Sequence, residues 1–228
     1  PNAFSVLAIS EKGGLLSAPD TYMEKIVIGS NLPNNLMDID NGVEKNIMLL
    51  AEAKKKKVSD INACVLKRPR HDSLVKILTR MKVKINYITD GDIAGALSVI
   101  GDNPLNDIYY STGGGPEGVL VAAALSCYGG QIQGRLVLNE EEKLRAKKLG
   151  ITDFSRKYNI NDMVKGDVIF CATGVTTGDL ASGVKDLGNE FEVNTFALHK
   201  SQNTIKSIIN IYNKWTVSYT HLRAHETI

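Results

Sequence analysis

Short apolar runs and stretches of helical periodicity alternate along the chain, and polar loops containing glycine, proline or aspartate separate them. The same order of strand, loop and helix recurs in four places. The predicted strands are 63–67, 84–89, 107–111 and 167–171, and the predicted helices that follow them are 71–81, 93–100, 119–127 and 180–187. Repeated units of this kind predict a layered α/β fold with largely parallel strands.

Other segments extend this pattern toward both ends. They are a loop at 30–42, a helix at about 43–56, a charged helix at 140–150 and a closing pair of strands at 191–215. Residues 2–10 alternate like a strand already under way, so we expect further chain to precede them. The tail at 216–228 has no matching periodicity and resembles a translated sequencing adapter, so we exclude it and its two histidines, His221 and His225, from site predictions.

Composition narrows the class of protein. The chain has 228 residues, of which 43% are hydrophobic and 23% charged, as in globular proteins with a sizeable core. Its net charge of +2 argues against nucleic-acid and membrane-surface partners. Three separated cysteines without C-x-x-C spacing are typical of reduced thiols, so we expect a cytoplasmic protein. We find no apolar run of transmembrane length and no signal-peptide pattern.

A polar loop follows each of the four predicted strands, at the sheet edge where open α/β folds bind ligands. The loops contain Arg68 and Arg70, Asp90 and Asp92, residues 113–118, and residues 173–179. Together they offer guanidinium groups, carboxylates, a glycine-rich turn and hydroxyls. This mixture suits a ligand that carries both phosphate and hydroxyl groups.

The stretch Gly113-x-Gly115-x-x-Gly118 matches the dinucleotide-binding pattern, since it follows a predicted strand and opens a predicted helix. However, Glu117 puts a carboxylate where a pyrophosphate would lie, and Pro116 removes an N–H donor. A divalent cation between carboxylate and phosphate would resolve this conflict. An ordinary helix start, with proline and an acidic residue in the first turn, also explains the sequence.

Two further motifs have both a binding and a structural interpretation. Arg68-Pro69-Arg70 presents paired guanidinium groups that can grip a phosphate, although surface arginines are common in loops. Asp90-Gly91-Asp92 can bind sugar hydroxyls or a metal, or can cap the following helix. For Tyr22, the ordinary structural interpretation is an aromatic residue in the core. No spacing recommends a Ser-His-Asp or Cys-His pairing.

Five motifs, in order and spacing, resemble class II fructose-1,6-bisphosphatase: APDTYMEK, RPRHD, TDGDIAGAL, GGGPEGVLVAAAL and FCATGVTTGDLASGV. The resemblance covers residues 2–212 and implies the layered α/β sugar-phosphatase fold of the lithium-sensitive, metal-dependent phosphatases. It also implies that residues 1–58 end an N-terminal α/β domain and that 59–215 form the C-terminal substrate- and metal-binding domain.

The resemblance implies a role for each candidate residue. Glu117 corresponds to a glutamate that binds a catalytic Mn²⁺ or Mg²⁺ ion. The implied substrate-binding residues are Tyr22, Arg68, Pro69, Arg70, Asp90, Gly91, Asp92 and Gly114. The arginine motif would hold the phosphate that is not cleaved, with Arg68 in a position where the family has lysine, and the two aspartates would bind sugar hydroxyls. No residue of the chain corresponds to a further catalytic group.

The implied reaction is hydrolysis of the 1-phosphate of fructose 1,6-bisphosphate to fructose 6-phosphate in gluconeogenesis, with sedoheptulose 1,7-bisphosphate as a second substrate. The family's Gly-Glu-Gly-Glu and Asp-Pro-Ile-Glu-Gly-Thr motifs, which supply most metal ligands, do not occur in these 228 residues. We therefore expect the chain alone to be inactive, because one carboxylate is too few for a strong magnesium site.

The resemblance also implies a homo-oligomer, a dimer or tetramer, when the protein is full length. Two alternative functions remain open from the residues themselves. One is a non-catalytic phosphosugar-binding domain, and the other is a nicotinamide-dependent oxidoreductase built on the glycine pattern.

Overall fold

The computed structural model describes residues 3–178 and 181–214, and within them the chain forms two β-sheets and six α-helices. The strands are β1 (Phe4–Ser10), β2 (Tyr22–Ile28), β3 (Asn62–Leu66), β4 (Lys84–Ile88), β5 (Ile108–Gly114), β6 (Gln131–Val137), β7 (Lys157–Tyr158), β8 (Val168–Gly174), β9 (Lys185–Asp186), β10 (Glu190–His199) and β11 (Thr204–Asn213). The helices are α1 (Gly42–Ala53), α2 (Asp72–Arg80), α3 (Asp92–Leu97), α4 (Gly115–Tyr128), α5 (Glu140–Lys148) and α6 (Ile160–Met163), with 3₁₀ turns at η1 (Ile39–Asn41), η2 (Val58–Asp60) and η3 (Pro69–His71). The predicted α/β class is confirmed, and the tail at 216–228 lies outside the described residues.

The larger sheet has the strand order β4-β3-β5-β2-β6-β7. Within it β4, β3 and β5 are parallel, whereas β2 and β6 run antiparallel to their neighbours. The second sheet has the order β1-β8-β10-β11, with β9 beside β10, and all its pairs are antiparallel. The prediction of largely parallel strands is confirmed for three of the four predicted strands, β3, β4 and β5. It is wrong for β8, which pairs antiparallel with β1 and β10 in the other sheet.

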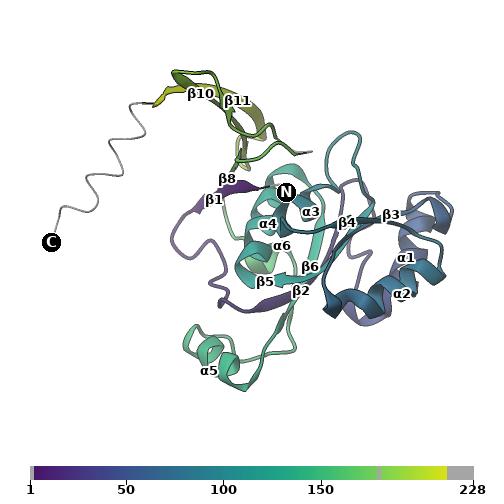
Figure 1. Cartoon of the computed structure of the whole chain (residues 1–228). Helices are drawn as coiled ribbons and strands as arrows, with labels where there is room; N and C mark the ends of the chain where they lie inside the picture. Colours follow the sequence, from purple (N-terminus) through teal and green to yellow (C-terminus); the bar gives the residue numbers. More distant parts are fainter. Residues whose placement is uncertain (1–2, 179–180, 215–228) are drawn as a thin grey trace.

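The two sheets and the helices stack in layers (Figure 1). Helices α1 and α2 cover one face of the larger sheet, α3, α4 and α6 cover the opposite face, and the second sheet packs beyond α4. Helix α4 thus lies between two sheets, and this explains its composition, since a helix enclosed on all sides is apolar all round. Its buried apolar residues are Val119, Val121, Ala122, Ala123, Ala124 and Leu125.

The junction between β5 and α4 differs from the prediction of a loop at 113–118. Strand β5 continues to Gly114, because its last residues pair with the first residues of β2, with Gly114 opposite Tyr22 and Gly113 opposite Met23. Helix α4 begins at the next residue, and the Gly115 N–H donates to the Thr21 carbonyl at 2.7 Å. The strand therefore passes into the helix without a loop, and the first turn of α4 is fixed to the sheet.

The segment after β8 is not the helix predicted at 180–187. Residues 181–184 have no helical structure, and Lys185–Asp186 form β9; residues 179–180 lie outside the described part. The Gly178 N–H donates to the Ala181 carbonyl, and the Gly183 N–H donates to the Thr177 hydroxyl. These bonds hold the segment close to the end of β8. They also use backbone N–H and C=O groups that a helix would need.

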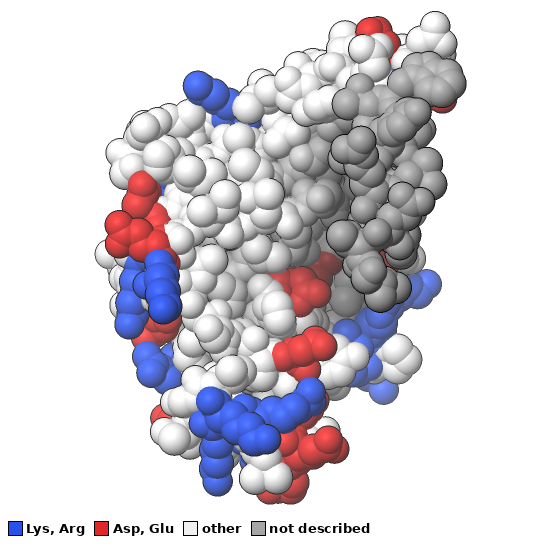
Figure 2. Space-filling model, turned by 90° about the vertical axis from the view of Figure 1, so that its left-hand side faces the viewer, with Lys and Arg blue, Asp and Glu red and all other residues white. Residues whose placement is uncertain are grey.

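The predicted closing pair of strands is confirmed as the hairpin of β10 and β11, which projects from the body of the molecule in Figure 1. Strand β11 is an edge strand, and several of its apolar side chains are exposed, including Ile209 at 60% and Ile211 at 56%. Basic and acidic side chains cluster together at the lower end of the face in Figure 2, and its upper part carries few charges. None of the described helices is long and apolar enough to cross a membrane.

Residues 1–58 contribute strands to both sheets, β1 to the second and β2 to the middle of the larger one. The division into an N-terminal domain ending at 58 and a C-terminal domain at 59–215 stays a prediction.

Candidate functional site

Three of the four predicted polar loops meet where β2 begins and β5 ends. The Arg70 Nε donates to the Thr112 carbonyl at 2.7 Å, which joins the arginine motif to β5. The Asp92 carboxylate lies against Gly113, and the Glu117 carboxylate lies against Gly114. The end of the sheet thus carries two groups of side chains, arginines toward the side of α1 and α2, and carboxylates toward the side of α3 and α4.

The carboxylate group borders a cavity of about 440 Å³. Asp90, Asp92 and Glu117 line it, and so do apolar residues of β1, α3 and α4, among them Phe4 and Leu120. Glu117 lies in the first turn of α4, where the partial positive charge of the helix end favours a carboxylate. The cavity combines acidic groups with an apolar wall, as expected for a site that binds a sugar through its hydroxyls and its carbon face.

Two glycines allow these carboxylates to approach the strand. A Cβ atom on Gly113 would overlap the Asp92 carboxylate, and one on Gly114 would overlap the carboxylate of Glu117. The backbone of Gly114 has φ −60° and ψ 142°, which any residue adopts, so a side chain there would conflict only with the present position of the Glu117 carboxylate.

The other glycines of the dinucleotide pattern are also explained by packing within the chain. A Cβ on Gly115 would meet the carbonyl oxygens of Pro19 and Thr21 at 3.2 and 3.3 Å. A Cβ on Gly118 would lie 2.6 Å from the Met23 sulfur. The pattern G-x-G-x-x-G therefore has a complete structural explanation here without a bound pyrophosphate, and this removes the main support for a nicotinamide cofactor.

A buried lysine that is not among the predicted site residues lies behind the carboxylates. The Lys25 Nζ donates to Asp92 Oδ2 at 2.5 Å and to the Gly114 carbonyl at 2.8 Å. The Tyr109 hydroxyl donates to the other oxygen of Asp92. Burial lowers the pKa of Lys25, and the neighbouring Asp92 carboxylate opposes that shift. Burial and the same carboxylate raise the pKa of Tyr109 far above its usual value, so its hydroxyl remains a donor.

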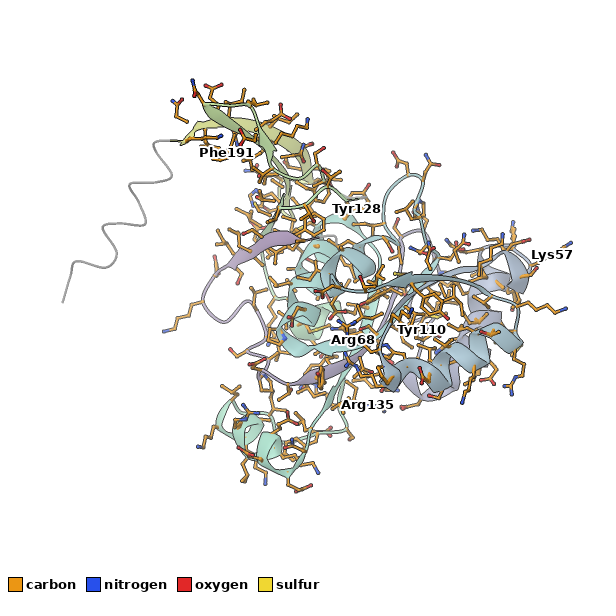
Figure 3. The ribbon with its side chains drawn as sticks, viewed as in Figure 1. Lys57, Arg68, Tyr110, Tyr128, Arg135 and Phe191 are labelled. Carbon is orange, nitrogen blue, oxygen red and sulfur yellow. The ribbon has the colours of Figure 1, made fainter. Side chains whose placement is uncertain are left out.

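On the other side of the sheet end, the arginine motif forms η3, with Pro69 at its start. The Arg70 guanidinium lies over the Tyr22 ring, 4.7 Å from its centroid. Arg68 donates from Nη1 to the Thr89 carbonyl at 2.6 Å, and Figure 3 labels it near the middle of the view. Both arginines are thereby positioned by backbone carbonyls, and the stacked Tyr22 is half-exposed instead of the core residue that its ordinary explanation predicted.

His71 connects the arginine motif to β5. Its Nδ1 donates to the Leu66 carbonyl at 2.6 Å, and its Nε2 accepts from the Thr112 N–H at 2.8 Å. Only a neutral ring can make both bonds, because a protonated Nε2 would face another donor. Burial lowers the pKa of His71, which favours the same neutral form. The residue thus has a structural role and joins the ends of β3 and β5.

The Asp90-Gly91-Asp92 turn contains one position that requires glycine. Gly91 has φ 89° and ψ 59°, a left-handed conformation that residues with a side chain rarely adopt. Its N–H donates to Asp90 Oδ1 at 2.9 Å, and α3 begins at Asp92. The turn places the two carboxylates beside the same cavity.

The fourth predicted loop, 173–179, does not supply a side chain to this cavity within the described residues. Thr173 pairs with Thr195 of β10, and the Thr176 hydroxyl accepts from the Ala3 N–H. The loop instead supports the first residues of β1, which border the cavity. Asp179, the last residue of that loop, lies outside the described part.

One Ser-His-Asp group exists that spacing did not reveal, but its geometry is unsuited to a relay. His199 Nε2 and the Ser201 hydroxyl both contact the same oxygen of Asp167, at 2.8 and 2.7 Å. In a relay the histidine would stand between the acid and the hydroxyl. The group joins β8 to the turn between β10 and β11.

Within residues 3–178 and 181–214, no three side chains among His, Cys, Asp and Glu gather as a metal site would require. Glu117 offers one carboxylate at this place, and the described residues do not provide a complete ligand set for a hard cation.

The alternation of side chains along β2 could have indicated Lys25 from the sequence. Met23, Lys25 and Val27 alternate onto one face of β2, and a charged residue between two apolar ones on a buried face is unusual. The sequence carries no comparable signal for Tyr109 or His71, because an aromatic residue in a strand and a histidine before a helix are both ordinary.

Known proteins resemble this chain over most of its length. Residues 1–212 match the family model of bacterial fructose-1,6-bisphosphatase, glpX-encoded. A fructose-1,6-bisphosphatase class 2 of Haemophilus influenzae is 36% identical over 92% of this chain and 67% of its own length. A D-fructose 1,6-bisphosphatase class 2/sedoheptulose 1,7-bisphosphatase of Synechococcus sp. strain JA-3-3Ab is 34% identical over 93% of this chain.

The chain spans about two thirds of the length of these relatives, 67% and 65% respectively. The fructose-1,6-bisphosphatase 1 class 2 of Escherichia coli K12 is 33% identical, again over 67% of its length. The match of the family model over nearly all described residues, together with these identities, shows that the chain belongs to the class II fructose-1,6-bisphosphatase family.

Proposed function

We propose that the protein hydrolyses the 1-phosphate of fructose 1,6-bisphosphate to fructose 6-phosphate with the help of Mn²⁺ or Mg²⁺, and that the described residues hold the sugar and its distal phosphate. Sedoheptulose 1,7-bisphosphate is a second proposed substrate, since one relative carries both names. The observation that supports this best is the placement of arginines and carboxylates on either side of one sheet end.

The arginine side would bind the phosphate that is not cleaved. Arg70 uses Nε on the Thr112 carbonyl, and its two terminal nitrogens can serve as a fork for phosphate oxygens. Stacking on Tyr22 holds the guanidinium plane in place. Binding at this remote phosphate would orient the rest of the substrate, so the energy of the contact contributes to the reaction at the other end.

The carboxylate side would bind the sugar and approach the reacting phosphate. Asp90 and Asp92 would accept hydrogen bonds from sugar hydroxyls in the cavity that they line. Glu117 would hold a divalent cation together with ligands from outside the described residues. When bound, such an ion neutralises charge on phosphoryl oxygens and lowers the pKa of a bound water.

The proposed binding is tested by calorimetric titration of the 228-residue chain with fructose 6-phosphate. We expect saturable binding that Arg70→Met weakens at least about tenfold, since a charge-assisted bidentate contact would be lost. Arg80→Met is the matched control, because Arg80 lies on α2 and pairs with Glu44 instead. Absence of binding, or equal loss in both variants, would contradict the proposal.

A separate assay measures release of phosphate from fructose 1,6-bisphosphate by the same chain with Mn²⁺. We expect no meaningful turnover, because Glu117 alone does not make a metal site. Robust turnover would show that the ligand set is complete. Two results together would favour the alternative of a non-catalytic phosphosugar-binding domain. The chain would bind fructose 6-phosphate equally well with and without Mn²⁺, and a longer chain would release no phosphate from fructose 1,6-bisphosphate.

A further inference from the structure

Lys25 and Tyr109 are buried polar residues to which the proposed function gives no role. The Lys25 side chain is 0% exposed, and that of Asp92 is 12% exposed. Lys25 Nζ donates to one oxygen of Asp92 and the Tyr109 hydroxyl donates to the other, so the plane of the carboxylate is fixed from behind. Each carboxylate oxygen can still accept a second hydrogen bond from the side of the cavity.

A lysine at this position is costly for the fold. Burying an ammonium group destabilises the fold unless it is paired, and an apolar residue of similar size is often as stable or more stable. The neighbours of Lys25 on the same face of β2, Met23 and Val27, are apolar and fully buried. The protein therefore places a charge where its own core requires none, and both hydrogen bonds of that charge lead to residues at the sheet end.

The two bonds of Lys25 connect separate elements. Asp92 is the first residue of α3, and Gly114 is the last residue of β5. One ammonium group thus sets the distance between the acid at the start of α3 and the backbone at the start of α4. Tyr109, five residues earlier on β5, holds the same acid from a second direction.

We propose that Lys25 and Tyr109 are positioning residues for sugar recognition: they fix Asp92 and the Gly114 carbonyl relative to each other, so that a sugar hydroxyl meets an acceptor already in place. This inference rests on the proposed function, because it takes Asp92 as a sugar ligand. A group held in its binding geometry before the ligand arrives loses less freedom on binding, which strengthens that contact.

The test compares two ligands on the same chain. Fructose 6-phosphate would use both sides of the sheet end, whereas inorganic phosphate would use only the arginine side. Tyr109→Phe is the main variant, since it deletes one hydroxyl and keeps the ring in the core. Tyr110→Phe is the matched control, because Tyr110 packs on the opposite face, among the residues under α1 and α2 (Figure 3).

We expect Tyr109→Phe to weaken fructose 6-phosphate about three- to tenfold and to leave the dissociation constant of inorganic phosphate unchanged. Lys25→Met should weaken the sugar phosphate more than about tenfold, since it removes a charged donor from two acceptors. In an Asp92→Ala background, Tyr109→Phe should have no further effect on sugar-phosphate affinity, because its acceptor is gone.

Three results would overturn the inference. If the wild-type chain binds fructose 6-phosphate and Tyr109→Phe binds it equally well, the positioning role fails and the proposed function stands. If both ligands weaken by the same factor, the residues support the fold alone. If the wild-type chain binds no fructose 6-phosphate, the proposed function fails, and the inference fails with it.

Discussion

At the scale of single residues, the adjacent glycines 113 and 114 serve two different carboxylates. Gly113 faces Asp92, which Lys25 and Tyr109 hold in place, whereas Gly114 faces the end of the longer Glu117 side chain. A methyl group added at position 113 or 114 therefore meets a carboxylate that differs in its freedom to move. The first neighbour has no room to move, and the second can swing away.

This difference predicts unequal costs for Gly113→Ala and Gly114→Ala. We expect Gly113→Ala to lower the free energy of unfolding by about 1–3 kcal/mol, as overpacking against a fixed group does. We expect Gly114→Ala to cost less than about 1 kcal/mol, because the Glu117 carboxylate can rotate to another position. Urea denaturation of both variants beside the wild type measures the difference. Equal costs, or a larger cost for Gly114→Ala, would show that Asp92 is not fixed as described.

The neutral ring of His71 predicts a dependence of stability on pH. Burial lowers its pKa in the folded chain, so below about pH 6.5 the unfolded chain binds a proton that the folded chain does not. Stability from this group therefore falls as the pH falls, by at most about 1.4 kcal/mol per pH unit. Above the unfolded pKa, the ring is neutral in both states and the pH has no effect through it.

The measurement is urea unfolding of the wild type and of His71→Gln between about pH 7.5 and 5.5. The glutamine variant cannot titrate at this position, so the other histidines cancel in the comparison. We expect the stability advantage of the wild type to shrink toward acid pH. An advantage that stays constant over this range would contradict the neutral bridge between Leu66 and Thr112.

At the scale of elements, periodicity was sufficient to predict most helices and strands, because their apolar positions face a core on one side. It failed at the end of β5. Residues 112–114 are extended because β2 pairs with them, and β2 lies about ninety residues earlier in the chain. Glycines that resemble a loop in the sequence are strand residues here, since a partner strand fixes their backbone.

The contacts of the arginine motif predict that Arg68 and Arg70 differ in importance. Arg70 donates through Nε and stacks on Tyr22, and both contacts need a planar guanidinium. Arg68 donates to exposed backbone carbonyls, which an ammonium can also reach. We expect Arg70→Lys to weaken fructose 6-phosphate about tenfold and Arg68→Lys by less than about threefold. Calorimetric titration of both variants checks the order, and a larger effect of Arg68→Lys would contradict it.

At the scale of the whole molecule, the sequence predicted the layered class but not the membership of each sheet. Strand β8 has the same local pattern as β3 and β5, yet its neighbours are β1 and β10. Which sheet a strand joins depends on partners distant in the sequence, and periodicity does not contain that information. The site residues found by motif lie together, whereas Lys25, Tyr109 and His71 emerge only when the elements are packed.

The exposed hairpin predicts self-association of the 228-residue chain. Strand β11 offers ten residues of edge backbone beside exposed isoleucines, a surface on which strands of other copies can pair. We expect light scattering to show species larger than a monomer, and Ile209→Lys to reduce them, because a charge on an edge strand opposes pairing. Fructose 6-phosphate affinity should not change. A wild-type chain that is monomeric at all concentrations would contradict this prediction.

The sheet end separates the arginines from the carboxylates and so sets the distance between the two groups. A ligand that reaches both must pass around the ends of β2 and β5, so its two contact groups have to lie far enough apart to span them. A molecule with only one of those groups can occupy one half and leave the other free. Length, and not charge alone, then contributes to the choice of ligand, because a sugar phosphate too short to span the sheet end would contact only one of the two groups.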